Sequence, residues 1–172
     1  IVFRNIFITK TALLILCLAV VSAFFAVLTG NEASVIIKVW TDETSALLKG
    51  VAGHAGLFST AEDIHNLLIT LLNKGKYKEK QIIKSSTVEL FTKKYDNSSR
   101  ALGWDIKSPQ GSSAGKFFSD RSFGHTGFTG TSAWIDPVRK LIVIFLTNRV
   151  HPTRENIKII KVRPQLHNAV MK

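Results

Sequence analysis

The hydrophobic and polar positions of the chain form their clearest pattern in residues 58–76, "FSTAEDIHNLLITLLNKGK". Apolar side chains recur there every three or four residues, the period of one helix face, at Ile64, Leu67, Leu68, Leu71 and Leu72. Ser59 and Glu62 have the spacing of a capping box, and Gly75 suits the C-terminal cap. The pattern predicts an amphipathic helix, with His65 off the apolar stripe and in solvent.

Two further segments predict helices. "SSTVELFTKKY" (85–95) predicts a short helix, with Ser86 and Glu89 as a second capping box. The tail predicts another that starts at Pro152 and is kinked or ended at Pro164, because proline lacks the N–H that a helix interior needs.

Three segments have the composition and pattern of strands, namely 100–106, 122–135 and 140–148. The last two are joined by "DPVRK" (136–140), whose Asp-Pro pair favours a turn. "LIVIFL" (141–146) is continuously apolar, which predicts a strand that is buried on both faces. A polar loop rich in glycine and serine is expected over 108–116.

A long apolar segment precedes these elements. Residues 11–30 are 20 positions without a charged side chain, and a helix of that length spans about 30 Å, the hydrocarbon thickness of a bilayer. Arg4 and Lys10 precede it, which favours a cytoplasmic N-terminus. Three interpretations stay open: an uncleaved membrane anchor, a cleaved signal peptide or a buried core helix. Residues 31–50 then form a linker, and 51–172 form the folded domain.

Composition narrows the classes of partner. The formal net charge is +11, from 23 Lys and Arg against 12 Asp and Glu, which favours anionic partners such as nucleic acid, anionic lipid or acidic wall polymers. No nucleic-acid module and no aromatic-basic stacking pattern is present, so nucleic acid is not expected.

The single cysteine, Cys17, excludes an internal disulfide. The histidines are too scattered for a metal site, and no cofactor is expected; they are His54, His65, His125, His151 and His167.

The segment "GHTGFTGTSAWIDP" (124–137) concentrates candidate chemistry. His125 has the one side chain that titrates near neutrality, and Thr126 offers a hydroxyl. Gly127 lets a substrate backbone approach closely. The N–H of Phe128 can serve as half of an oxyanion hole, where removing one donor costs roughly 3 to 4 kcal/mol. By itself the tripeptide also fits a glycine-loosened strand in a hairpin.

Three separate stretches give this segment a context: "GVAGHAGLFSTAEDI" (50–64), "FGHTGFTGTSAWIDP" (123–137) and "NRVHPTREN" (148–156). Together they resemble the serine β-lactamase-related family, which includes penicillin-binding proteins of the DD-peptidase type and class C-like esterases. The resemblance runs from about Trp40 to the C-terminus. It implies an α+β fold, a partial β-lactamase/DD-peptidase-like domain with an antiparallel sheet flanked by helices, and a place in the bacterial cell envelope.

The resemblance also implies roles for particular residues. His125, Thr126 and Gly127 match the family's Lys-Thr-Gly or His-Thr-Gly motif, and the backbone of Phe128 matches the oxyanion donor. Thr129 is a further expected substrate contact. For His54, between two glycines, two interpretations stay open: a contact to the ligand, or a structural hydrogen bond to a neighbouring loop.

The family's nucleophile is a serine three residues before a lysine on a helix, assisted by Tyr-x-Asn. Here Ser113 to Lys116 and Tyr95 to Asn97 match in letters only, because both stretches have the composition of loops. The nucleophile is therefore unknown. We expect the C-terminal portion of an acyl-serine hydrolase for D-amino-acid peptides, β-lactams or esters, inactive or nearly so without a nucleophile half. The alternatives are a membrane-anchored binding module for cell-wall or other anionic ligands, and a non-functional gene fragment.

Overall fold

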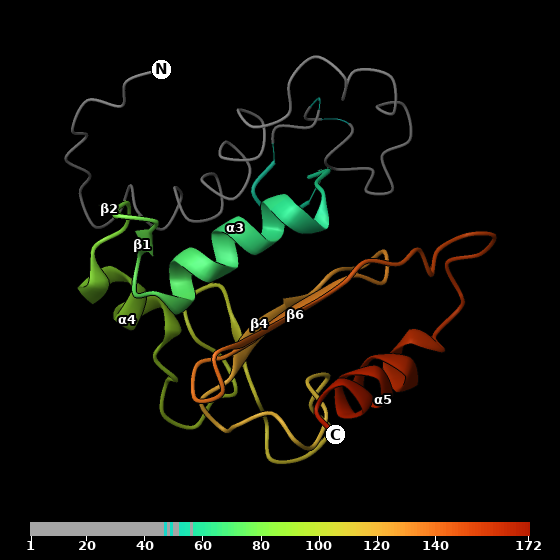
Figure 1. Ribbon diagram of the computed structural model, residues 1–172. Helices are drawn as coiled ribbons and strands as arrows, with labels where there is room; N and C mark the ends of the chain where they lie inside the picture. Colours follow the sequence, from blue (N-terminus) through green and yellow to red (C-terminus); the bar gives the residue numbers. More distant parts are fainter. Residues whose placement is uncertain (1–46, 48, 50–51, 56) are drawn as a thin grey trace. The chain divides into compact units, whose positions relative to one another are not determined.

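The computed structural model describes residues 47, 49, 52–55 and 57–172. The chain divides into two compact units, 1–59 and 60–172, and the second contains all the elements named below. In chain order (Figure 1) these are α3 (Ala61–Leu72), β1 (Lys76–Tyr77), β2 (Lys80–Gln81), α4 (Ser85–Thr92), β3 (Asp105–Ile106), β4 (Phe123–Thr126), β5 (Ser132–Asp136), β6 (Leu141–Phe145) and α5 (Ile159–Val170).

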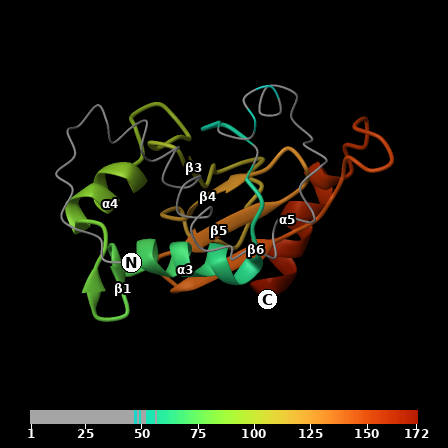
Figure 2. The ribbon, with the colours of Figure 1, turned by 90° about the horizontal axis from the view of Figure 1, so that it is seen from above.

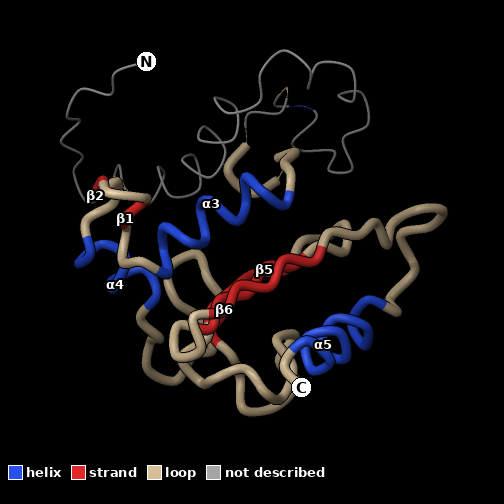
Figure 3. Tube along the Cα trace, in the orientation of Figure 1, coloured by secondary structure: helices blue, strands red, loops and turns tan. Residues whose placement is uncertain are grey.

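The centre of this unit is an antiparallel sheet in the order β3-β4-β5-β6 (Figure 2), two strands of which, β5 and β6, are labelled and drawn in red in Figure 3. Its register pairs Gly124 of β4 with Trp134 of β5, and Trp134 with Val143 of β6. Strands β1 and β2 form a separate small hairpin. The expected α+β fold, with an antiparallel sheet flanked by helices, is confirmed.

Each face of the sheet has its own hydrophobic core. Leu68 of α3 packs on one face against the cluster Ile106, Phe123 and Ile135. On the other face, Leu166 of α5 packs against the cluster Ala114, Phe118, Trp134 and Val143. Consecutive strand residues point to opposite faces, so neighbouring Trp134 and Ile135 enter different cores. Helices α3 and α5 therefore cover opposite faces of the sheet (Figures 1 and 2).

The prediction of one strand over 122–135 is wrong, because the chain reverses direction after Thr126. The N–H of Gly127 donates to the carbonyl of Thr131 at 2.7 Å, which closes a hairpin between β4 and β5. Gly130 has a φ of +116°, a conformation that glycine adopts without strain. The glycines that suggested close substrate approach thus also make the turn.

The other two strands are shorter or less buried than predicted. Of 100–106, only Asp105–Ile106 is a strand, because Ala101 donates its N–H to the Trp104 carbonyl and the chain turns there. In β6 only Val143 is fully buried, so burial on both faces does not hold along "LIVIFL". Within the described part of the chain β6 is an edge strand of the sheet, with β5 as its neighbour.

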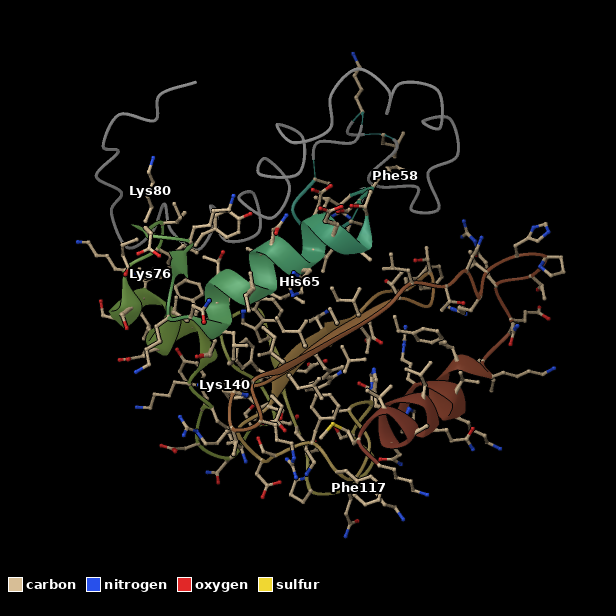
Figure 4. The ribbon with its side chains drawn as sticks, viewed as in Figure 1. Phe58, His65, Lys76, Lys80, Phe117 and Lys140 are labelled. Carbon is tan, nitrogen blue, oxygen red and sulfur yellow. The ribbon has the colours of Figure 1, made fainter. Side chains whose placement is uncertain are left out.

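Helix α3 forms as predicted, but its caps are shifted by one residue. Thr60, not Ser59, is the N-cap, since its Oγ1 accepts the N–H of Asp63 at 3.2 Å. At the other end Lys74 takes the left-handed conformation with a φ of +55°. Gly75 then donates its N–H to Thr70 at 2.7 Å, as in a Schellman motif. Of the predicted stripe, Ile64, Leu68, Leu71 and Leu72 pack in the core on the sheet side. His65, labelled on α3 in Figure 4, is exposed as predicted.

The contribution of the Thr60 cap to stability can be tested by mutation. Thr60→Ala should lower the free energy of unfolding by about 1 kcal/mol, because the Asp63 N–H loses its acceptor. Thr60→Ser, which keeps a hydroxyl oxygen, is the matched control and should stay close to the parent chain. Urea denaturation of both variants measures the difference, and equal losses would show that the hydroxyl does not act as a cap.

The remaining helices correct two more predictions. Helix α4 begins at Ser85 without a side-chain cap, and the hydroxyl of Ser85, not Ser86, donates to Glu89. Helix α5 begins at Ile159 rather than near Pro152, and it continues through Pro164 to Val170. Its buried residues are spaced four apart on one face: Ile159, Arg163 and His167. Tertiary contacts on both sides of the proline therefore hold the helix together at the cost of one backbone hydrogen bond.

The predicted apolar helix over 11–30 lies outside the described residues, as does most of the predicted linker 31–50. Among the helices that the structure describes, none combines the length and hydrophobicity needed to cross a bilayer. The anchor, the signal peptide and the core helix thus stay predictions.

Candidate functional site

The His-Thr-Gly tripeptide spans the end of β4 and the start of its turn into β5. His125 pairs with Ala133, and Thr126 pairs with Ser132. Because the two residues are consecutive in a strand, their side chains lie on opposite faces of the sheet. Ala133 belongs to the core beneath α3, so His125 lies on the α3 face, where it is exposed. Thr126 lies half-buried on the α5 face.

Two cavities meet at Thr126. One, of about 240 Å³, lies between the β4–β5 turn and the start of α5, and its lining includes Gly127, Phe128, Arg149 and Arg163. The other, of about 280 Å³, is shared by Thr126 and Arg163 with the polar loop that contains Ser113. The structure therefore brings Thr126, Gly127 and Phe128 together at one cavity, with two arginines that the sequence analysis had not singled out.

Arg163 binds the inside of the β4–β5 turn. Its Nη2 donates to the carbonyls of Gly127 at 2.7 Å and Thr131 at 2.8 Å, and its Nε donates to Gly130 at 3.2 Å. The side chain is only 8% exposed. Three carbonyl dipoles thus replace the water that a buried guanidinium has lost.

Arg149 binds the outside of the same turn. Its Nε donates to the Phe128 carbonyl at 2.7 Å, and its guanidinium lies 4.3 Å from the centroid of the Phe128 ring. The backbone N–H of Arg149 donates to the carbonyl of Thr129 at 2.7 Å. The segment after β6 therefore holds Phe128 and Thr129 through side-chain and backbone contacts.

The N–H of Phe128 is left free by this arrangement. Within the part of the chain that the structure describes, it donates no hydrogen bond, although its carbonyl and that of Gly127 are both bound. The Phe128 ring is 56% exposed, so solvent and small molecules reach this side of the turn. A free backbone donor beside a cavity is the geometry that an oxyanion hole needs.

The site is electrostatically positive. Burial lowers the pKa of Arg163, and the nearby charge of Arg149 lowers it further. Neither arginine forms an ion pair with a carboxylate among the described residues. An oxygen that carries or develops negative charge is therefore favoured in this region.

A buried histidine lies behind the site. His167 is fully buried on α5, and its Nδ1–H donates to the Ser113 carbonyl at 2.7 Å. Burial lowers the pKa of His167, and the charge of Arg163 adds to this, while the hydrogen bond to Ser113 opposes it. The ring packs edge-on against Phe118, with the two ring centroids 5.7 Å apart. Its contacts are those of a core residue that ties α5 to the 108–118 loop.

The letter matches to the nucleophile motif lie in loops, as predicted. Ser113 is half-buried and Lys116 exposed, and neither belongs to a helix. Tyr95 to Asn97 is an exposed loop. His54 is exposed and belongs to the first compact unit. Among the residues that could be placed, no three His, Cys, Asp or Glu side chains are grouped in a way that could hold a metal ion.

The sequence contains a pattern that indicates a buried position for Arg163. Ile159, Arg163 and His167 are spaced by four residues, so a helix that passes Pro164 puts all three on one face. A helix that ends at Pro164 does not reach His167, so the predicted end at the proline hid this spacing. Arg149 had no such signal, because only the folded turn brings it to Phe128.

Comparison with known proteins assigns the family. The Beta-lactamase family matches residues 26–166, which is most of the sequence. The chain belongs to the beta-lactamase family. This confirms the resemblance to the serine β-lactamase-related family that the three sequence stretches indicated.

Individual curated proteins are similar to this chain over about 60% of its length. The chain is 39% identical over 105 residues to "Putative D-alanyl-D-alanine carboxypeptidase" of Escherichia coli (strain K12), which covers 59% of this chain and 24% of that protein. It is 40% identical over 107 residues to "N-acetylmuramyl-L-alanine amidase" of Bacillus subtilis (strain 168), which covers 60% of this chain and 24% of that protein. The chain thus spans about a quarter of the length of these relatives.

Proposed function

We propose that this chain supplies the substrate-binding strand and one oxyanion donor of a serine hydrolase that acts on peptides ending in D-alanine. The observation that carries the proposal is the free N–H of Phe128 beside Thr126, in a turn whose carbonyls are held by Arg149 and Arg163. Membership of the beta-lactamase family and the names of its relatives support the reaction class and the substrate.

Each residue has a chemical role in this proposal. The Phe128 N–H donates to the carbonyl oxygen of the scissile bond, which gains negative charge when the bond is attacked. The Thr126 hydroxyl donates to the substrate's terminal carboxylate, and the positive charge of Arg163 favours that carboxylate at the cavity. Thr129 extends the contact along the peptide. His125 is exposed on the other face of the strand, where its Nδ1–H donates to the Thr126 carbonyl at 2.8 Å.

Cell-wall peptide is the proposed natural source of such a ligand. The net charge of +11 suits an anionic polymer, and the apolar segment 11–30 would bring the domain to the envelope as an anchor or signal peptide. Localisation outside the cytoplasm is therefore part of the same proposal.

Peptide binding tests the proposal without requiring turnover. A short peptide ending in D-alanyl-D-alanine, added to ¹⁵N-labelled protein, should shift the amide signals of residues 125–129, and the L-alanyl-L-alanine isomer should not. Thr126→Val, which removes the hydroxyl at nearly constant volume, should weaken binding about fivefold, the effect of one hydrogen bond. Thr87→Val on α4 is the matched control, since its hydroxyl makes no hydrogen bond within the described residues. Equal shifts with both isomers would reject a D-specific site.

Ser113 is the serine to examine for nucleophilic chemistry, because it lines a cavity together with Thr126. Exposure to a fluorophosphonate or a penicillin, followed by intact-mass analysis, should leave Ser113 unmodified, since no lysine is fixed beside it on a helix. A stoichiometric adduct on Ser113 would instead make this serine the nucleophile.

A further inference from the structure

The peptide unit between Gly127 and Phe128 is held at one end only. The Gly127 carbonyl accepts two hydrogen bonds, from Arg163 Nη2 at 2.7 Å and from the Gly130 N–H at 3.1 Å. A trans peptide is planar, and its C=O and N–H point in opposite directions. The contacts to the carbonyl therefore also determine where the Phe128 N–H points, which is away from Arg163.

We propose that Arg163 is a positioning residue that keeps the Gly127–Phe128 peptide from flipping and so aims the Phe128 N–H. This proposal rests on the proposed function only in giving that N–H a use as the oxyanion donor. Arg163 itself touches no substrate atom in this role, because it acts through the Gly127 carbonyl.

Glycine makes such control necessary. A peptide flip needs rotation about the ψ of residue 127 and the φ of residue 128, and glycine places the least resistance on the first of these. Without Arg163 the Gly127 carbonyl would keep only the Gly130 N–H, a neutral contact at 3.1 Å within the same short turn. The bond from Arg163 is shorter, charge-assisted and comes from 36 residues away in the chain.

The geometry of Arg163 suits this role better than that of a general packing residue. One guanidinium contacts the carbonyls of Gly127, Gly130 and Thr131, and the planar fork makes the three contacts mutually dependent. Arg149 holds the next peptide unit through the carbonyl of Phe128. Arg163 thus holds the Gly127–Phe128 peptide and Arg149 holds the Phe128–Thr129 peptide, each through its carbonyl oxygen. The N–H of Phe128 stays free.

Residual dipolar couplings of backbone amides test the proposal, because they report the orientation of each N–H. Arg163→Met should change or average the coupling of Phe128, while amides in the centres of β5 and β6 keep theirs. Arg163→Lys keeps the charge but not the fork, so we expect a partial change. Arg121→Met is the matched control: Arg121 is exposed and makes no hydrogen bond or ion pair within the described residues, so its loss should leave Phe128 unchanged.

Two outcomes would overturn the proposal. The first is a Phe128 coupling in Arg163→Met equal to that of the parent chain. The second applies even if that variant does not fold: in the parent chain the Phe128 N–H should have an order parameter near that of rigid backbone, about 0.85, and a value below about 0.6 would show that nothing positions it.

Peptide binding separates this proposal from the proposed function. Arg163→Met should raise the dissociation constant of the D-alanyl-D-alanine peptide about tenfold, because the Phe128 N–H is no longer aimed and the positive charge that favours the peptide carboxylate is lost. The dissociation constant of Arg163→Lys should lie between those of the parent chain and Arg163→Met. If the parent chain binds no peptide, the proposed function fails, whereas the couplings still decide whether Arg163 orients Phe128.

Discussion

Gly124→Ala should destabilise the folded chain by about 3 kcal/mol, and by more if the sheet cannot shift. Gly124 lies in β4 directly opposite Trp134. A Cβ there would collide with the carbonyl oxygen of Ala133 and lie within 2.5 Å of Trp134 Cδ2. Trp134 is buried at 1% exposure in the core beneath α5, so its ring cannot move aside without opening that core.

Gly103→Ala is the control for this substitution. Gly103 has a φ of +81°, yet a Cβ there would meet no atom within 4 Å. It should therefore cost only the backbone strain, about 1 kcal/mol. Urea denaturation of both variants gives the two values. If Gly124→Ala costs no more than Gly103→Ala, the close packing of Trp134 on β4 is not rigid.

The second large effect is expected at Asp136. This carboxylate is fully buried and accepts hydrogen bonds from the Ser119 N–H and hydroxyl at 2.8 and 2.7 Å. It also accepts the backbone N–H groups of Val138 and Arg139 and the Arg139 guanidinium at 3.0 Å. Asp136→Asn replaces one acceptor oxygen by a donor, so buried donors lose their partner. We expect a loss of about 3 kcal/mol in the free energy of unfolding.

Asp96→Asn provides the reference for this measurement, because Asp96 is exposed in the loop before β3. It should leave the denaturation midpoint within experimental error. If Asp136→Asn lowers the free energy of unfolding no more than Asp96→Asn does, the β5–β6 turn does not depend on the carboxylate.

The contribution of Asp136 to the free energy of unfolding should depend on pH. Burial raises the pKa of Asp136, but the hydrogen bonds from Ser119 and Arg139 outweigh it, so the pKa lies below its usual value. A carboxyl whose pKa is lower in the folded than in the unfolded chain stabilises fully above the unfolded value, about 3.9. Its contribution is lost as pH falls below that value towards the folded pKa. The parent chain and Asp136→Asn should thus differ by a constant amount above about pH 5 and converge in acid.

Local periodicity was enough to predict α3, the helix at α4 and the strand at β6, but not the β1–β2 hairpin or the division of 122–135 into β4 and β5. The apolar stripe of α3 depends only on neighbours in the chain, and such a pattern predicts which side of a helix is buried. The same holds for the solvent position of His65, one residue off the stripe. The His-Thr-Gly motif predicted a site at the end of a strand, and its residues span the end of β4 and the turn that follows.

Element ends were less predictable, because competing local signals differ by little free energy. Ser59 and Thr60 are both good N-caps, and the choice falls on Thr60, whose Oγ1 can also donate to the Asp63 carboxylate. Pro164 has the strongest local signal against a helix, yet α5 passes through it. Burial of Ile159, Arg163 and His167 on one face outweighs the lost hydrogen bond.

The sequence by itself thus determined the family resemblance, the helices α3 and α4 and the buried face of α3. Only the tertiary structure decided that the chain turns back after Thr126 and that Arg149 and Arg163 hold the turn between β4 and β5. These features depend on residues that lie far apart in the chain. A contact such as Arg163 to Gly127, separated by 36 residues, exists only after both core layers have packed against the sheet.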